Sequence, residues 1–462
     1  MACGGVFMSS MDDAEDKKAQ LEKAKLPGKK AMIWHPFYGG KVEIISKCRV
    51  KDFSDFGVWY TPGVAEPCKA IEKEPLLAYE HTNKWNYIAV ASNGTRVLGL
   101  GDIGPLAGYP VMEGKSLLFK YLGGVDATAL MIDTKDPEKF IETVKLAAPT
   151  FGGINLEDIR TPDCFYILDR LRKELDIPVW HDDQQGTAAI SLAGVINGLK
   201  VAGKKLPESQ ITLVGAGAAN ICLARTLLKS GLPSNKLLMV DSKGILGPHR
   251  SDLEAKKEHN PYKWELASAT NGECLEGGTK EALEGADVLV SASKPGPGTI
   301  KKEWLAGMAD TPVVFAEANP VPEIWPWEAK EAGVKIFGTG RSDFPNQVNN
   351  SIGFPGIFRG TLDVRAKTIS DEMHISAAHA IASTAEEKGI HAGYLVPTMD
   401  ETEVFVNEAV AVAEKAMEQG LARVKISRQE LRERATDIIS SARAKTGLMM
   451  EKGHILEPPA VG

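Results

Sequence analysis

The stretch ITLVGAGAANICLARTLLKSG, residues 211 to 231, decides the fold because an apolar run, two closely spaced glycines and a helical pattern follow one another. Gly215 permits a tight turn, and Gly217 lets the backbone approach a pyrophosphate at the start of a helix. Ala218 and Ala219 come next, and Asn220 stands at the third fingerprint position, where Gly or Ala is usual. The stretch predicts a Rossmann-type dinucleotide site formed by these residues, although a turn that merely needs positive φ has similar text.

The next apolar run ends at Asp241, where a carboxylate would accept the ribose hydroxyls of NAD. Ser242 and Lys243 follow it, and His249 and Arg250 lie a few residues further on. These four side chains could instead hold the 2′-phosphate of NADP. A polar loop with incidental basic residues would have the same sequence pattern. The choice between NAD and NADP therefore stays open, with NADP favoured.

Outward from this stretch, apolar runs alternate with helical patterns from YIAVAS (87–92), through TRVLGL (95–100), to IPVW (177–180). Such alternation predicts an α/β fold with parallel strands. The segment 41–50 is predicted to be a strand and residues 12–25 a charged amphipathic helix, while the chain becomes mainly helical after about residue 356. We expect an N-terminal substrate and metal domain over residues 1–185, a Rossmann-type domain over 186–420 and a helical tail over 421–462.

Two pairs of acidic residues occupy matching places at predicted strand ends. Asp182 and Asp183 follow IPVW in WHDDQQGT, and Glu157 and Asp158 stand one β-α unit earlier in GGINLEDI. Ligands of open α/β sheets bind at this edge, and four carboxylates gathered there need a positive partner. Mg²⁺ or Mn²⁺ is the natural partner, since both prefer oxygen ligands. The alternative is that each pair simply favours the start of a helix.

Other polar side chains are candidates for the chemistry. Lys115 follows a glycine-rich segment and could act as a general base near the acidic pairs, although most lysines at helix starts are solvated. Asn319, Asn349 and Asn350 follow predicted strands and could donate to a substrate carboxylate, although asparagine also forms turns. Tyr60, in WYTPGVAEP, could take part in the chemistry or could simply pack in the core or at its rim, and its own sequence context does not decide between these roles.

Together these segments resemble the malic enzyme family in its short form. The resemblance runs from about residue 41 to about residue 420. The matching segments are YTPGVAEPC, RVLGLGDIGP, MEGKSLLFK, GGINLEDI, WHDDQQGTA, LVGAGAAN, ANPVPEI and GRSDFPNQVNNSIGFPGIFRG.

This resemblance implies oxidative decarboxylation of L-malate to pyruvate and CO₂, with reduction of NAD⁺ or NADP⁺ and dependence on Mg²⁺ or Mn²⁺. It implies that Lys115 is the general base, Tyr60 the general acid and Asp182 the acid beside the lysine. The implied metal ligands are Glu157, Asp158 and Asp183. The implied substrate residues are Arg96, Asn319 and one of Asn349 and Asn350, and Asn319 is also expected at the cofactor. A homodimer or higher homo-oligomer is expected.

Composition excludes several other classes of protein. The formal net charge of -7 provides no basic surface for nucleic acid, and no apolar stretch is long enough for a membrane span. Six scattered cysteines indicate neither disulfides nor a zinc site, and the acidic N-terminus resembles no signal peptide, so we expect a cytoplasmic protein. Alternatives that remain are a malolactic or oxaloacetate-decarboxylating lyase, a metal-free amino-acid dehydrogenase and a catalytically silent nucleotide-binding regulator.

Overall fold

The computed structural model describes residues 25–461, which fall into two units. In the smaller unit, the described residues up to Ile44 join those from Ala444 onward. Residues 25 to 38 are helical there, and Trp34 Nε1 donates to the Pro459 carbonyl at 3.1 Å. The helix expected over residues 12–25 lies outside the described residues apart from its last residue. The larger unit, Ile45–Arg443, contains both sheets.

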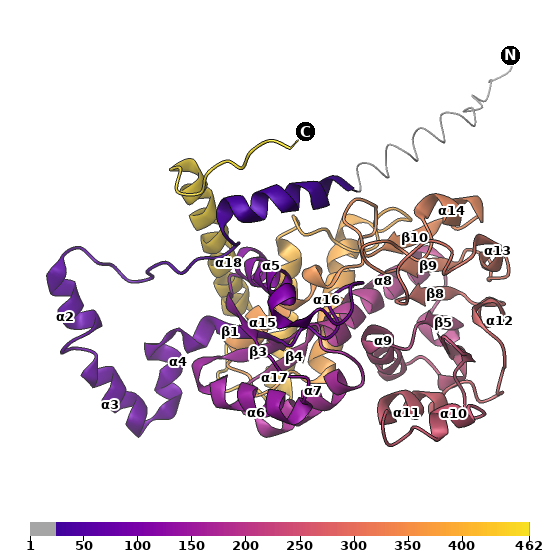
Figure 1. Cartoon of the computed structure of the whole chain (residues 1–462), viewed down its shortest axis with the longest axis horizontal. Helices are drawn as coiled ribbons and strands as arrows, with labels where there is room; N and C mark the ends of the chain where they lie inside the picture. The colour runs from indigo at the N-terminus through magenta and orange to yellow at the C-terminus, as the bar shows by residue number, and fades with distance from the viewer. Residues whose placement is uncertain (1–24, 462) are drawn as a thin grey trace, which may run out of the picture. The chain divides into compact units, whose positions relative to one another are not determined.

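The first sheet has four parallel strands in the order β2-β1-β3-β4 (Figure 1). Its strands are β1 (Tyr87–Ser92), β2 (Asp126–Met131), β3 (Gly153–Leu156) and β4 (Val179–His181). The register pairs Leu156 with His181, so β3 and β4 end side by side. This is the parallel α/β arrangement that the alternating sequence pattern predicts.

Both faces of the first sheet are covered, as expected for parallel strands that are apolar on both sides. Ile88 and Val90 of β1 belong to one core, which α5 (Gly104–Gly123) and α15 (Phe354–Asp363) complete. Ala89 and Ala91 of the same strand belong to the other core, with α6 (Pro137–Ala147) and α7 (Asp163–Glu174). The sheet is thereby held rigidly, and only its edge is free to carry polar groups.

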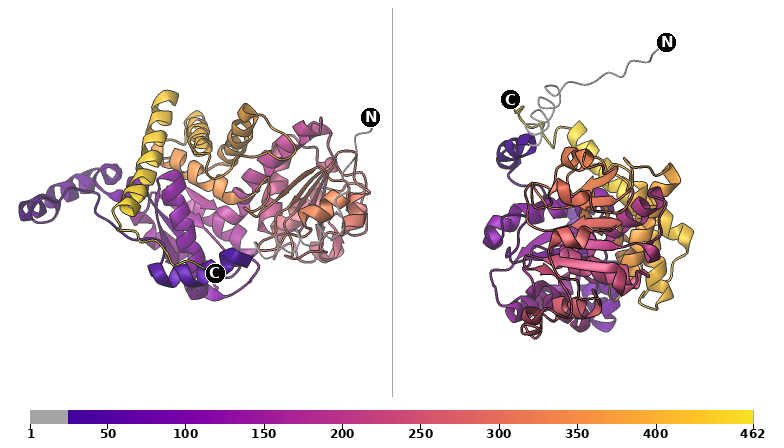
Figure 2. Two further views of the ribbon diagram at one scale, coloured as in Figure 1. Left: turned by 90° about the horizontal axis from the view of Figure 1, so that it is seen from above. Right: turned by 90° about the vertical axis from the view of Figure 1, so that its right-hand side faces the viewer.

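The second sheet has six strands in the order β10-β9-β8-β5-β6-β7, all parallel except β7 (Figure 2). Its strands are β5 (Ile211–Val214), β6 (Leu237–Asp241), β7 (Gly244–Ile245), β8 (Val288–Ser291), β9 (Val313–Ala316) and β10 (Ile336–Thr339). Its helices are α8 (Thr187–Val201), α9 (Ala218–Lys229), α10 (Ser251–Glu254), α11 (Pro261–Ala269), α12 (Thr279–Leu283), α13 (Lys302–Leu305) and α14 (Pro326–Glu331). The order places β5 centrally, with the glycine-rich turn at its end.

After β10 the chain returns to the first sheet instead of continuing on the second. Phe354 and Phe358 of α15 pack on Phe119 of α5, with ring centroids 4.5 and 5.2 Å apart. The fully buried Arg359 donates to Asn86, just before β1, at 2.6 Å. The remaining helices are α16 (Asp371–Lys388), α17 (Glu403–Glu418) and α18 (Arg428–Glu451). The chain therefore passes between the two sheets twice.

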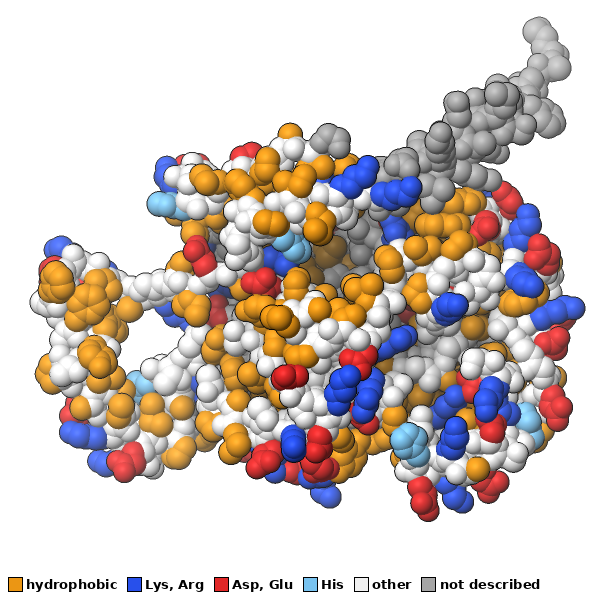
Figure 3. Space-filling model, in the orientation of Figure 1, with side chains coloured by type: hydrophobic (Ala, Val, Ile, Leu, Met, Phe, Trp, Pro, Cys, Tyr) orange, Lys and Arg blue, Asp and Glu red, His pale blue; other side chains and the backbone are white. Residues whose placement is uncertain are grey.

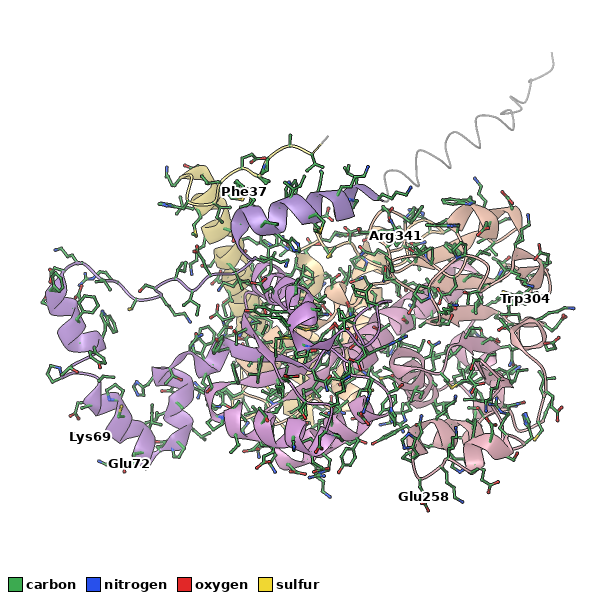
Figure 4. All side chains as sticks on the ribbon, viewed as in Figure 1. Phe37, Lys69, Glu72, Glu258, Trp304 and Arg341 are labelled. Atoms are coloured by element: carbon green, nitrogen blue, oxygen red, sulfur yellow. The ribbon has the colours of Figure 1, made fainter. Side chains whose placement is uncertain are left out.

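An arm formed by α2 (Phe56–Trp59), α3 (Ala65–Lys73) and α4 (Ala78–His81) precedes β1. In both views α2 and α3 lie away from the two sheets (Figures 1 and 2), and Lys69 and Glu72 point outward from α3 (Figure 4). Apolar side chains lie on the outside of the arm (Figure 3). Trp59 of α2 is 48% exposed, and Phe53, which precedes α2, is 90% exposed. Such a surface is typical of a contact with another macromolecule.

Two of the strands predicted from the sequence do not form. Residues 41–50 form no strand, and Ile44 is 95% exposed. The segment has β-prone residues, but no neighbouring strand offers it backbone partners. Residues 95–100 form a tight loop with a single bridge between Val97 and Gly101. Within residues 25–461, no helix is both long and apolar enough for a membrane span.

Candidate active site

The turn after β4 holds its first acid firmly. His181 ends the strand, and the π-helical turn η5 (Asp182–Gly186) leads directly into α8. Trp180 Nε1 donates to Asp182 Oδ1 at 3.1 Å, and the side-chain oxygen of Gln185 accepts from the His181 amide at 3.0 Å. A Cβ at Gly186 would lie 1.9 Å from Asp182 Oδ1, so only glycine leaves room for this carboxylate. The sequence HDDQQG is thus needed for the shape of the turn as well as for its charge.

The four predicted carboxylates and the predicted lysine come together at this edge. Lys115 Nζ, from the middle of α5, lies 2.5 Å from Asp182 Oδ2 and 3.0 Å from Glu157 Oε1. The amide of Asp158 donates to Asp183 Oδ2 at 2.8 Å, which links the two acidic pairs. Lys115, Glu157, Asp158 and Asp182 are all buried. The two acidic pairs, which the sequence places at the ends of neighbouring strands, therefore form one cluster with Lys115.

This cluster carries more negative than positive charge. Burial, followed by the charge of Asp183, raises the pKa of Asp158 to about 8. Burial also raises the pKa of Glu157, Asp182 and Asp183. For Lys115, burial lowers the pKa, but Asp182 and Glu157 together outweigh it, and the net direction is upward. One ammonium thus balances four crowded acids, and a further cation would relieve their repulsion.

The donor chemistry of the cluster suits a hard divalent cation, but the ligands are not yet arranged around one. Asp158 Oδ2 is buried and has no hydrogen-bond partner among the described residues. Glu157 is turned toward Lys115, and its other oxygen accepts from Asn155 at 2.9 Å. In the described part of the chain, no three Asp, Glu, His or Cys side chains are arranged as a metal-binding set. A cation held by these acids would have to draw the Glu157 carboxylate away from Lys115 and Asn155.

The structure distinguishes the two neighbouring asparagines. Asn349 starts a short helical turn, since its Oδ1 accepts from the Ser351 amide at 3.0 Å. Its Nδ2 donates to the Gly340 carbonyl at 3.3 Å. The Cβ of Asn350 lies 3.2 Å from where a Cβ of Gly186 would be. Asn349 is therefore a structural cap, and Asn350 is the amide beside the acidic turn.

Arg96 and Asn319 approach the cluster from two loops. The Arg96 amide donates to the Asp158 carbonyl at 3.0 Å. Burial raises the pKa of Asp158 and Asp183, and the exposed Arg96 guanidinium offsets a small part of that rise. The Asn319 carbonyl oxygen lies 3.1 Å from where a Cβ of Gly99 would be. The loop after β1, which carries Arg96, thus meets the loop after β9, which carries Asn319.

Tyr60 is the predicted site residue that the chain does not bring to the cluster. It follows α2 in the arm, and 72% of it is exposed. In both views the arm lies apart from α5, which carries Lys115 (Figures 1 and 2). Within one chain, the predicted acid and the predicted base are therefore separated.

The glycine-rich turn after β5 has the shape that a dinucleotide site requires. Gly215 has φ +99°, and a Cβ there would lie 2.4 Å from the Ala292 carbonyl oxygen. Gly217 precedes α9, and no atom lies within 4 Å of where its Cβ would be, so the start of the helix is open. Asn220 explains the departure from the fingerprint, because its buried amide donates to the Val214 and Gly215 carbonyls at 2.9 and 3.0 Å.

The charge of Asp241 is compensated within the protein. Arg250 donates to it at 3.1 Å, and Lys263 Nζ lies at 2.5 Å. The Lys243 side chain instead pairs with Asp252 at 3.0 Å, and Ser242 is exposed. Burial would raise the pKa of Asp241, but Arg250 and Lys263 lower it overall. Lys263 lies on α11, and the sequence analysis missed it because no local pattern joins it to the end of β6.

Comparison with known proteins places this geometry in a family. The family model "Malic enzyme, N-terminal domain" matches residues 39–137 and 133–172, and "Malic enzyme, NAD binding domain" matches residues 184–417. The chain belongs to the malic enzyme family. Membership agrees with the site, since Lys115, Glu157, Asp158 and the glycine-rich turn lie within the matched ranges, and Asp182 and Asp183 lie between the two ranges.

Individual malic enzymes resemble most of the chain. It is 46% identical over 404 residues to the bifunctional malic/malolactic enzyme of Bacillus subtilis, covering 87% of this chain and 96% of that one. It is 49% identical over 385 residues to the NAD-dependent malic enzyme of Geobacillus stearothermophilus, covering 83% and 78%. The crystal structure of the Entamoeba histolytica malic enzyme superposes with a TM-score of 0.92 and 44% identity, covering 98% and 93%.

One residue of this malic enzyme site was missed although its motif was quoted. Phe354, from the segment GFPG, lies with its ring centroid 4.3 Å from Lys115 Nζ. Phe354 belongs to α15, which follows the second sheet in the chain but packs on the first sheet. Its contact with Lys115 therefore could not be predicted from the sequence. Its apolar ring closes one side of the lysine and helps to exclude water from the amine.

Proposed function

We propose that this protein oxidatively decarboxylates L-malate to pyruvate and CO₂ while reducing NAD⁺ or NADP⁺. The observation that carries the proposal is the buried Lys115, held between Asp182 and Glu157 beside an acidic strand edge. A structural lysine would not need two carboxylates whose own burial is unfavourable. Family membership supports the same chemistry.

Lys115 would take the proton from the C2 hydroxyl of malate while the C2 hydride passes to the nicotinamide. Loss of CO₂ from C4 then leaves the enolate of pyruvate, which needs a proton at C3. Asp182 fixes the amine through its 2.5 Å contact, and Phe354 shields it from water. Arg96, Asn319 and Asn350 would hold the carboxylates of the substrate. These residues fix the geometry in which the hydroxyl proton and the hydride leave together.

Glu157, Asp158 and Asp183 would hold a Mg²⁺ or Mn²⁺ ion. When bound, the ion would compensate the carboxylates around Lys115, so that its amine can exist uncharged, and would polarise the substrate oxygens. The unpartnered Oδ2 of Asp158 supports this assignment.

NADP is the favoured cofactor. Asp241 by itself would repel a 2′-phosphate, but Arg250 and Lys263 already neutralise it. Ser242 and Lys243 are exposed at the end of the turn, and a phosphate there would compete with Asp252 for the Lys243 amine. Relatives of this chain include enzymes named for either cofactor, so family membership leaves this choice to the local charges.

A homodimer would complete the site. Tyr60 and the aromatic residues around it, Phe53 and Trp59 among them, form an apolar surface that the described part of the chain leaves exposed. The natural occupant of such a surface is a second copy, whose symmetry would bring each arm to its partner. Tyr60 of one chain would then protonate C3 beside Lys115 of the other.

A malolactic lyase is the second candidate, because the Bacillus subtilis relative is named as bifunctional. One assay separates the two functions. The purified protein is given malate and Mn²⁺ with NAD⁺ or NADP⁺, and both reduced cofactor and organic acids are measured. Pyruvate formed in equal amount with reduced cofactor is the expected result. Lactate without reduced cofactor would show the lyase instead. If neither pyruvate nor lactate forms, the proposal is contradicted.

A further inference from the structure

A second polar cavity lies outside the acidic cluster, on the other side of the turn η5. It has a volume of about 120 Å³ and is enclosed by four elements, α7, η5, α9 and α16. These elements come from segments far apart in the chain, and the cavity is bounded by helices attached to both sheets. The proposed reaction uses none of its side chains.

Unsatisfied hydrogen-bonding atoms line this cavity. Gln185 and His374 are each 2% exposed, and the Nε2 atom of each has no partner among the described residues. Arg172 Nη2 and Arg225 Nε are likewise buried without a partner within residues 25–461. Buried polar atoms are nearly always hydrogen-bonded, so four in one cavity indicate that an acceptor belongs there.

The charges of the lining favour an anion. Arg172, Arg225 and Lys229 supply three positive charges to the lining, whereas Asp169 and Asp371 supply two negative ones. Arg225 also pairs with Glu265, which does not line the cavity, and because the Glu265 side chain is 59% exposed, solvent screens this contact and it offsets the charge of Arg225 only in part. Asp371 contacts Lys229 and lies 3.6 Å from Arg172, so it positions both cations without neutralising them all. Asp169 is turned away toward the hydroxyl of Tyr262, which donates to it at 2.9 Å.

The imidazole adds a neutral donor. His374 packs edge-on against Trp180, with ring centroids 5.6 Å apart. Burial lowers the pKa of His374 to about 4, so the ring is uncharged near neutral pH. Phe165, Leu168 and Ile375 line the rest of the cavity, which suits a ligand with a short carbon chain as well as an oxyanion group.

We propose that this cavity binds a small oxyanion, a carboxylate or a phosphate, held by Arg172, Arg225, Gln185 and His374. The two arginines would donate charge-assisted hydrogen bonds, and the amide and imidazole would complete the set. The occupant would bridge α7 and α9 and would contact the same turn that carries Asp182 and Asp183.

Direct binding to the full-length protein tests this proposal without relying on catalysis. Inorganic phosphate and succinate are titrated separately by calorimetry, in chloride buffer of matched ionic strength. Saturable binding of at least one probe is expected, and the stronger of the two identifies the kind of oxyanion. Arg172→Gln should weaken that binding about tenfold to hundredfold, as expected for one charge-assisted contact.

Two variants serve as controls. Lys173→Gln removes the same charge from the next residue of α7, which is exposed and does not line the cavity, so it should bind as the wild type does. Arg96→Ala, which removes a proposed partner of the substrate carboxylates, should also retain binding, and this separates the cavity from the active site. If Arg172→Gln fails to fold by circular dichroism, Arg225→Gln, which removes the other arginine of the proposed set, replaces it with the same expectation. No saturable binding of either probe, or equal affinity in wild type and the cavity variant, would overturn the proposal.

Discussion

Whether Tyr60 and Lys115 act across two chains can be decided by mixing two inactive variants. Tyr60→Phe removes the phenolic proton donor, and Lys115→Ala removes the amine. Each alone should lower kcat by roughly two to four orders of magnitude, the usual loss for a positioned acid or base. The structure places the two groups on separate parts of one chain, the exposed arm and the buried α5. A site made from two chains would therefore take one group from each.

The recovery expected on mixing follows from this arrangement. In a dimer of one Tyr60→Phe chain and one Lys115→Ala chain, one site has both defects and the other has none. Random reassembly of equal amounts makes about half of the dimers mixed, so about a quarter of wild-type activity should return. A mixed dimer isolated with two affinity tags should have about half. The signal exceeds the residual activity of either variant by more than about tenfold.

A matched mixture provides the control. Lys115 and Asp182 are 2.5 Å apart in the same chain, so mixing Lys115→Ala with Asp182→Asn leaves one defect in every site and should restore nothing. The assay is formation of reduced nicotinamide with malate and Mn²⁺ after co-refolding. Only residual activity in the Tyr60 and Lys115 mixture would refute the assignment of Tyr60 to the partner's site.

Three further changes test the cation, the turn and the cofactor. Asp183→Asn keeps the shape of the side chain but removes its charge, so the Mn²⁺ concentration for half-maximal turnover should rise at least about tenfold. An unchanged Mn²⁺ concentration would show that Asp183 is not a ligand. Gly186→Ala forces a Cβ against the Asp182 carboxylate, and kcat should fall about a hundredfold while cofactor binding, measured by fluorescence titration, is retained. Replacing Ser242 and Lys243 by alanine should raise KM for NADP⁺ about tenfold to hundredfold and leave NAD⁺ nearly unchanged, and equal losses would mean that both side chains merely support the loop.

The parallel strands could be predicted from the sequence because apolar runs such as 87–92 alternate with helical patterns. The gathering of Asp182 with Glu157 could also be predicted, since adjacent parallel strands end at the same edge. Residues 41–50 were predicted wrongly because a strand depends on a partner as well as on its own residues. The predicted boundary near residue 185 and the catalytic roles of the site residues stay predictions.

Contacts between distant elements could not be predicted in the same way. Lys263, on α11, neutralises Asp241 at the end of β6. Phe354, which comes after all strands of the second sheet in the chain, covers Lys115 on α5. The choice between Asn349 and Asn350 depends on which one caps a turn, and their sequence context is nearly the same. The separation of Tyr60 from Lys115 depends on the path of the arm, on which no local pattern bears.

The return of α15 to the first sheet has a consequence for how the molecule can be cut or rearranged. Two covalent connections join the sheets, one at η5 and one between β10 and α15, and Asp182 and Asn350 lie in them. Proteolysis at either connection alone would leave the fragments attached through the other. A nucleotide-binding half exchanged from a relative must therefore be inserted between two fixed points. Any swinging of one sheet against the other must turn about both connections, so Asp182 and Asn350 lie on the pivot itself, where displacement is smallest.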